Sequence, residues 1–329
     1  MIKKVTIKDV AKESGVSIST VSQILNGRTK HFNKDTISRV LAVKEHLNYE
    51  ADYFARRMIV KKSRTIGILV PSISNPYFAT LLEGIENVLF KERYVPIFSV
   101  VNRQNQREVN TLDELMHRGV DGFIIASDAI SDQVIQEKLT NRYPYIVLDQ
   151  KQSAHSLDVI ATDDYQGGKL AAQHLQELNH QSVAVLAPKI MTGNIEQRVI
   201  GFTENFTGEI CHLEAELTKD AGVAASNKII ESTATGIFTV SDEIAFGLYL
   251  GLSKFNKKIP TDYSLIGYDN TEMGEYVTPT LTTINQPACQ LGQITAKRLL
   301  DRINEPDKEL TLTKLPVNLI KRHSTAHLK

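Results

Sequence analysis

Apolar positions follow two different periods along the chain. Over residues 1–49 they recur at three- and four-residue spacing, which predicts three short helices with one apolar face each. From Thr65 onward, short runs rich in β-branched residues alternate with longer stretches of helical period. Such alternation predicts parallel sheets covered by helices on both faces, and the number of strands suits two sheets better than one. We therefore expect a small all-α domain followed by an α/β domain with two doubly wound parallel sheets.

The same pattern gives approximate bounds for each element of the α/β part. The predicted strands are 65–70, 96–101, 122–126, 145–148, 159–161, 182–187, 236–240, 264–267 and 281–284, with closing strands within 311–322. The clearest predicted helices are 79–90, 108–117, 167–178, 195–206, 244–255 and 291–303.

Residues 6–25 read as two short helices joined by a tight turn. Thr6 can cap the first helix in a capping box with Asp9. Gly15 stands where a left-handed residue ends that helix, and Ser17 can cap the next one. This pattern predicts a helix-turn-helix, although paired amphipathic helices also occur in many all-α domains without a DNA role.

The outer face of the second helix carries Ile18, Ser19, Ser22 and Gln23. A helix entering the major groove places such side chains against base edges, where Gln can bond adenine and an apolar group can contact a thymine methyl. The following polar and basic turn, 26–30, is placed to meet phosphates.

A third helix completes the small domain. Asn33 can cap it, and the helix is expected to end near Leu47. The residues expected to face inward are Ile37, Val40, Leu41 and Leu47.

Residues 50–64 combine apolar and basic side chains in a way that an ordinary solvated linker does not. Tyr53, Phe54, Met58 and Ile59 are apolar, and five Arg and Lys residues stand among them. The composition indicates that this stretch makes contacts of its own, and a helix packed on the larger domain in all states is one interpretation.

Charge is divided unevenly between the two parts. The 329-residue chain has no net charge, yet residues 1–64 hold 14 Lys and Arg against 6 Asp and Glu. A basic front on an acidic body predicts a polyanionic partner for the front alone. No segment predicts an export signal or a membrane span, and Cys211 and Cys289 are expected to be free thiols.

Polar and aromatic residues follow several predicted strands, at the end where α/β sheets bind ligands. They are Asn75, Tyr77, Phe78, Asp149, Asp163, Asp164, Arg198, Asp242 and Asp269. Carboxylates, a guanidinium and aromatic rings together suit a hydroxyl-rich ligand. For any single Asp, a turn or helix-cap role is equally plausible. Because nucleophile-elbow, HExxH, CxxC and GxGxxG motifs are lacking, we expect neither an enzyme nor a metal or other cofactor.

The helix-turn-helix stretch resembles that of the LacI/GalR family of bacterial repressors. The resemblance continues through NPYF at 75–78, VDGFII at 120–125, SDEIAFG at 241–247, IGYDN at 266–270 and LTTINQP at 281–287. It implies a DNA-binding domain at 1–49, a hinge helix at 50–64 and a periplasmic-binding-protein-like, two-lobed domain at 65–329. The expected lobes are 65–162 with 288–316, and 163–287 with 317–329.

The resemblance also implies two sets of site residues. The expected DNA-binding residues are Thr6, Ser17, Ile18, Ser19, Thr20, Ser22, Gln23, Asn26, Arg28, Ala55, Arg56 and Met58, with Met58 wedged into the central base step where the family usually has Leu. The expected effector-binding residues are Asn75, Tyr77, Phe78, Asp149, Arg198, Asp242, Asp269 and Gln286. NPYF followed by LDQ is most similar to the ribose repressor branch, which often has Arg where Gln150 stands. The interval between 206 and 236 is short for the family, which leaves one wall of the pocket undefined.

By this resemblance the chain is a cytoplasmic homodimeric repressor of a sugar-utilisation operon. Its partners would be a pseudo-palindromic double-stranded operator and a sugar-type effector, with ribose first and a hexose, a sugar phosphate or a purine as alternatives. A catabolite-control regulator whose effector is a phosphocarrier protein is a second interpretation. A solute-binding protein with no DNA role is a third.

Overall fold

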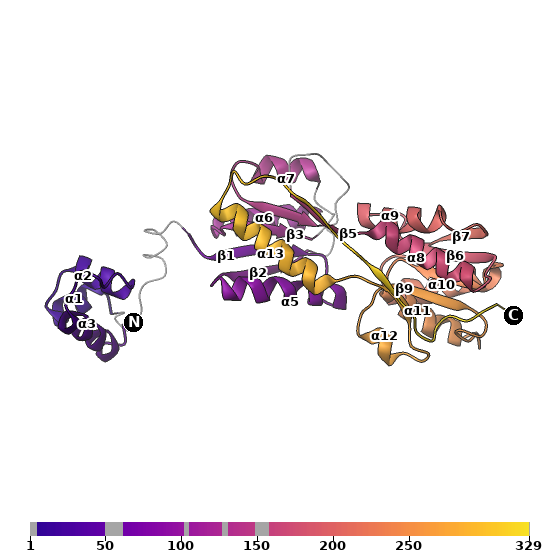
Figure 1. The fold of residues 1–329 in the computed structure, drawn as a ribbon, viewed down its shortest axis with the longest axis horizontal. Helices are drawn as coiled ribbons and strands as arrows, with labels where there is room; N and C mark the ends of the chain where they lie inside the picture. The colour runs from indigo at the N-terminus through magenta and orange to yellow at the C-terminus, as the bar shows by residue number, and fades with distance from the viewer. Residues whose placement is uncertain (1–4, 50–61, 102–104, 127–130, 149–157, 329) are drawn as a thin grey trace. The chain divides into compact units, whose positions relative to one another are not determined.

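The computed structural model describes residues 5–49, 62–101, 105–126, 131–148 and 158–328. The chain divides into two compact units, Met1–Ser63 and Arg64–Lys329. Figure 1 shows helices in the first unit, and lobes built of strands and helices in the second. Within the described residues, no helix is both long and apolar enough to span a membrane.

The smaller unit packs three helices around one apolar cluster. They are α1 (Ile7–Ser14), α2 (Ile18–Leu25) and α3 (Lys34–His46). Val10, Val21 and Val40 are fully buried where the three helices meet. The expectation that Leu41 faces inward was wrong, because this side chain is 42% exposed on the outer side of α3.

Local hydrogen bonds fix the ends of these helices. The Asp9 carboxylate accepts bonds from the Thr6 amide (2.9 Å) and the Thr6 hydroxyl (2.7 Å). Gly15 ends α1 with φ of 68°, a left-handed conformation that glycine adopts without steric cost. The Ser17 hydroxyl accepts the Thr20 amide (3.1 Å), which sets the direction in which α2 leaves the turn. The predicted helix-turn-helix is confirmed.

The larger unit contains two six-stranded sheets. The first has the order β11-β5-β4-β3-β1-β2 and is parallel throughout. Its strands are β1 (Thr65–Val70), β2 (Val95–Val100), β3 (Gly122–Ile125), β4 (Tyr145–Leu148), β5 (Val159–Thr162) and β11 (Leu312–Leu315). Its helices are α5 (Pro76–Lys91), α6 (Asn105–His117), α7 (Asp132–Leu139) and α13 (Ala288–Asn304).

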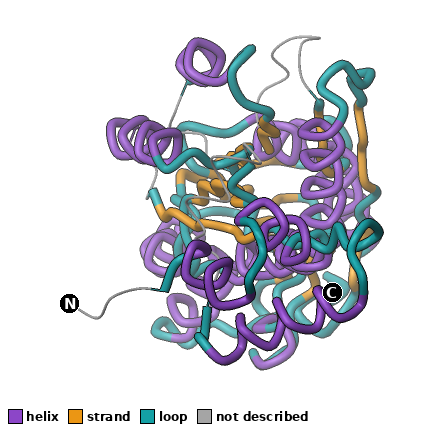
Figure 2. The backbone as a smooth tube through the Cα atoms, turned by 90° about the vertical axis from the view of Figure 1, so that its left-hand side faces the viewer, coloured by secondary structure: helices purple, strands orange, loops and turns teal. Residues whose placement is uncertain are grey.

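The second sheet has the order β12-β10-β9-β8-β6-β7, with only β12 antiparallel to its neighbour among the strands described. Its strands are β6 (Ser182–Ala187), β7 (Glu209–Glu214), β8 (Gly236–Thr239), β9 (Ser264–Asp269), β10 (Thr282–Asn285) and β12 (Asn318–Ile320). Its helices are α8 (Asp164–Glu177), α9 (Gly193–Thr203), α10 (Lys219–Glu231), α11 (Asp242–Ser253) and the short α12 (Met273–Tyr276). Figure 2 shows purple helices on either side of the orange strands, which confirms the predicted fold class.

Three connections carry the chain between the two sheets. They lie between β5 and α8, between β10 and α13, and between β11 and β12. We call these short segments, 162–164, 285–288 and 315–318, the crossovers. Any change in the angle between the lobes must be absorbed by these segments, because every other element belongs to one lobe.

Helix pairs within each lobe approach closely at glycines. A side chain at Gly168 of α8 would collide with the Arg198 carbonyl of α9, and one at Gly201 of α9 would collide with the Tyr165 carbonyl of α8. Gly84 of α5 and Gly292 of α13 meet the backbone of the opposite helix in the same way. The paired helices are therefore in direct backbone contact.

Residues 323–328 pack along the second lobe through buried polar groups. The Ser324 hydroxyl donates to the Leu265 carbonyl (2.6 Å), and His174 Nε2 lies 3.0 Å from the Thr325 hydroxyl. Burial lowers the pKa of His174 to about 4, and the positive charge of Lys321 adds to this effect.

This histidine should make stability fall in mild acid. Below pH 6.5 the unfolded chain binds a proton that the folded protein resists until about pH 4, so the free energy of unfolding should decrease by up to about 3 kcal/mol between these values. His174→Gln should remove that part of the pH dependence in urea unfolding measured at several pH values. An identical pH dependence in both proteins would contradict this assignment.

Candidate functional site

A cavity of about 420 Å³ opens between the two lobes of the larger unit. Both sheets contribute to it at the carboxyl ends of their strands, as expected for α/β folds. The lining residues are Pro71, Ser72, Ser74, Asn75, Tyr77, Phe78, Ala126, Leu148, Thr192, Asn194, Ile195, Arg198, Glu216, Leu217, Thr218, Ser241, Glu243, Asp269 and Gln286.

Most of the predicted effector-binding residues lie on this cavity. Six of the eight predicted residues line it: Asn75, Tyr77, Phe78, Arg198, Asp269 and Gln286. Asp149 lies outside the described residues, as does Gln150. The first lobe contributes the aromatic rings of Tyr77 and Phe78, which meet edge to face with centroids 5.1 Å apart.

Asp269 is held at the last position of β9 in an unusual conformation. Its φ of 118° lies in a region that residues other than glycine rarely adopt, which indicates backbone strain at this residue. Gln286 Nε2 donates to its Oδ1 (2.6 Å) and the Ser241 hydroxyl donates to its Oδ2 (3.1 Å). Arg198 Nη1 lies 3.7 Å from Oδ1. Burial raises the pKa of Asp269, and Arg198 and these donors only partly oppose that rise.

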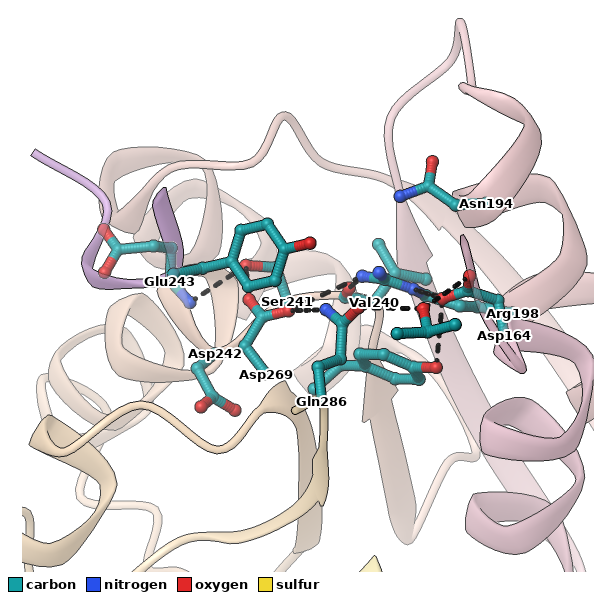
Figure 3. A network of polar contacts seen from close by, with 12 residues as sticks. Asp164, Asn194, Arg198, Val240, Ser241, Asp242, Glu243, Asp269 and Gln286 are labelled. Carbon is teal, nitrogen blue, oxygen red and sulfur yellow. Dashed lines mark hydrogen bonds and ion pairs between the residues drawn. The ribbon is translucent and has the colours of Figure 1, made fainter. Parts of the chain in front are cut away.

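Arg198 is held in place by several neighbouring groups beside the cavity, as Figure 3 shows. Only 4% of the residue is exposed. Its Nε donates to Asp164 (2.8 Å), its Nη1 donates to the Val240 carbonyl (2.8 Å), and its guanidinium lies 3.8 Å above the Tyr268 ring. Burial opposes the positive charge, but Asp164, Tyr268 and Asp269 outweigh burial and hold the pKa of Arg198 above its ordinary value. The guanidinium therefore stays charged and oriented beside the cavity.

Asp242 does not line the cavity, contrary to the prediction. It is fully buried and accepts hydrogen bonds from the Thr271 amide (2.8 Å), the Thr271 hydroxyl (3.2 Å) and the Thr283 hydroxyl (2.7 Å). In Figure 3 its carboxylate points away from Asp269 and Gln286. Its role is to hold the start of α11 against β10, and burial raises its pKa.

Sequence reasoning missed one wall of the cavity. Glu216, Leu217 and Thr218 connect β7 to α10, within the interval whose shortness left that wall undefined. Thr192 and Asn194 come from the start of α9, and Glu243 follows the Ser241 cap of α11. These residues stand in loops and first helical turns, where only the serine and threonine cap signals mark them.

On the smaller unit, the predicted DNA-contacting residues gather on and beside α2. Ile18 is 44% exposed, Ser19 is exposed, and Gln23 is half-buried with its amide 3.4 Å from the Ser19 hydroxyl. Ser17 and Thr20 share the N-terminal cap, and Asn26 donates to the Ser22 carbonyl (2.8 Å). Thr6 caps α1, and Arg28 is exposed after α2.

Ala55, Arg56 and Met58 lie outside the described residues, as does most of the predicted hinge. Contact of any of these residues with DNA stays a prediction.

Comparison with known proteins connects both units to one group. Residues 6–52 match the family described as bacterial regulatory proteins, lacI family, and residues 172–325 match the periplasmic binding protein-like domain. The ribose operon repressor of Haemophilus influenzae is 30% identical over 98% of this chain and 99% of its own length.

Solved structures agree. A LacI family transcriptional regulator from Enterococcus faecalis V583, with bound ribose, is 52% identical over 80% of this chain and all of that one, with a TM-score of 0.77. The lac repressor dimer bound to operator and an anti-inducer is 26% identical over 98% of this chain and all of that one, with a TM-score of 0.88.

Proposed function

Because the chain belongs to the lacI family of bacterial regulatory proteins, we propose that it is a repressor whose affinity for operator DNA is controlled by a neutral sugar, with ribose as the first candidate. The sugar would occupy the cavity between the lobes. The observation that carries this proposal is the oriented group of Asp269, Arg198 and Gln286 at the cavity. The 52% identity to a ribose-bound regulator over the corresponding domain supports it.

The chemistry of the cavity suits a polyol. A buried carboxylate accepts hydroxyl protons, a fixed guanidinium donates to hydroxyl oxygens, and an aromatic ring packs on the apolar face of a sugar. The acidic residues among the described lining are Glu216, Glu243 and Asp269. The basic residue there is Arg198, which is already paired with Asp164. This balance favours a neutral sugar over a sugar phosphate.

Calorimetric titration of the full chain with D-ribose, ribose 5-phosphate, glucose and adenine tests the effector. We expect ribose to bind and ribose 5-phosphate to bind at least tenfold more weakly. Operator binding is then measured with and without ribose over a range of salt, where contacts to phosphates predict a steep dependence. Operator binding without response to any of these ligands would favour the phosphocarrier interpretation. Sugar binding without DNA binding would favour a solute-binding protein.

We propose that two copies act together on a pseudo-palindromic operator. Large apolar side chains are exposed on both lobes, which suits burial against a second copy. They are Phe90, Val95, Phe98, Leu250, Phe255 and Tyr276.

Gln23 is the residue we expect to read a base directly. A bidentate amide contact is worth about 1–3 kcal/mol of discrimination, so Gln23→Ala should weaken operator binding roughly 5- to 150-fold and leave binding to random duplex nearly unchanged. Arg28→Ala is the matched control, because loss of a phosphate contact should weaken both complexes alike. An equal loss on both duplexes in Gln23→Ala would exclude Gln23 as a base reader.

A further inference from the structure

Five buried side chains form a closed ring between the cavity and the crossovers. Gln286 Nε2 bonds Asp269 (2.6 Å), and Gln286 Oε1 lies 3.1 Å from the Thr162 hydroxyl. The same hydroxyl lies 2.9 Å from Asp164 Oδ2. Asp164 Oδ1 accepts from Arg198 Nε (2.8 Å), and Arg198 returns to Asp269 at 3.7 Å. Asp269, Gln286 and Arg198 line the cavity, whereas Thr162 and Asp164 lie behind it.

Thr162 stands where all three crossovers meet. It is the last residue of β5, at the start of the first crossover, and it is 3% exposed. Its neighbour across the sheet is Leu315, and the Asp163 amide donates to the Leu315 carbonyl (2.8 Å) at the start of the third crossover. Its hydroxyl meets Gln286 in the second crossover. The Thr162 side chain therefore joins the first and second crossovers, and the backbone next to it is bonded to the third.

The Thr162 hydroxyl faces two acceptors with a single proton. The Asp164 carboxylate and the Gln286 amide oxygen both compete for it, while the Gln286 amide nitrogen is committed to Asp269. A ligand hydroxyl that donates to Asp269 weakens that carboxylate as an acceptor for Gln286. The Gln286 amide can then shift, and the sharing of the Thr162 proton shifts with it.

We propose that Thr162 is a positioning residue that couples sugar binding to the crossovers, without itself touching the sugar. In this ring the Thr162 hydroxyl holds the first and second crossovers together. Sugar contact at Asp269 and Arg198 alters this cross-link and thereby the angle between the lobes. The inference rests on the proposed function in one respect, namely that a sugar in the cavity changes the affinity for DNA.

Thr162→Val tests this, because valine keeps the shape and removes the hydroxyl. The full chain is assayed on a duplex that the wild-type protein selects from a random-sequence pool, with and without saturating D-ribose. We expect the ribose affinity of the variant to stay within about fivefold of wild type. The ratio of its DNA dissociation constants with and without ribose should fall to within about threefold of one. Thr162→Ser should restore the wild-type ratio. Thr295→Val is the matched control, because it removes an equally buried hydroxyl that donates to the Leu291 carbonyl of its own helix.

A second measurement needs no ligand. Hydrogen exchange of the crossover amides of residues 162–164, 285, 286 and 288 should be at least tenfold faster in Thr162→Val than in wild type, Thr162→Ser or Thr295→Val. Unchanged exchange, an unchanged ratio, or failure of Thr162→Ser to restore the ratio would each overturn the inference. If wild-type DNA binding ignores ribose, the proposed effector is wrong, and the exchange comparison alone then decides whether Thr162 joins the crossovers.

Discussion

Replacement of Arg198 by methionine should lower the free energy of unfolding by about 3–5 kcal/mol, because it leaves Asp164 and Asp269 buried without their cation. The guanidinium also bonds the Val240 carbonyl and covers the Tyr268 ring, and methionine replaces only the packing. Urea unfolding followed by circular dichroism measures the loss. Arg142→Met, on the exposed surface of the first lobe, should change stability by less than about 0.5 kcal/mol.

The loss of unfolding free energy in Arg198→Met, called the deficit below, should also depend on pH. Arg198 lowers the pKa of Asp269 against the effect of burial, so its removal lets that pKa rise further. Protonation of Asp269 in the folded variant then relieves the unpaired charge, and the deficit should be smaller at pH 5 than at pH 8. An equal deficit at both pH values would mean that lost packing, and not lost charge pairing, dominates.

Replacement of Asp269 by asparagine should weaken ribose binding at least 100-fold, about 3 kcal/mol. An amide cannot accept charge-assisted bonds from sugar hydroxyls, and its NH₂ group faces the donors Gln286 and Ser241. Titration calorimetry measures the affinity, and operator binding without ribose should stay within about threefold of wild type.

Asp220 is an exposed carboxylate in the first turn of α10, and Asp220→Asn controls for a general change in charge. It should leave ribose affinity unchanged. Near-normal ribose affinity in Asp269→Asn, with the variant folded, would move the effector site away from β9.

Local signals in the sequence were enough for the parts of the structure that depend on neighbouring residues. Gly15, Ser17 and Asn33 each end or begin a helix through bonds to residues within a few positions, so the helix-turn-helix could be read directly. The strand-end rule placed Asn75 and Asp269 on the cavity, because parallel strands bring their carboxyl ends to one edge.

Side-chain direction could not be read in the same way. Asp242 follows a predicted strand just as Asp269 does, but it turns to Thr271 and Thr283, which are distant in sequence. Leu41 fits a helical period, yet three short helices are too few to cover that side of α3.

The prediction also named no element at the positions of α7, β7, α10 and α12. α7 is only eight residues long, β7 is a half-exposed edge strand, and α10 packs mainly through small residues such as Gly222 and Ala225. None of them shows a strong apolar period, so the wall between β7 and α10 became visible only in three dimensions.

The glycine contacts between paired helices have a practical consequence for measurement. α8 and α9 touch through Gly168 and Gly201, and α5 and α13 touch through Gly84 and Gly292, so each lobe should move as a rigid body. A fluorescent donor on one lobe and an acceptor on the other would then report ligand occupancy of the cavity as a single change in the efficiency of energy transfer. The chain could thereby serve as a reagentless optical sensor of its own ligand.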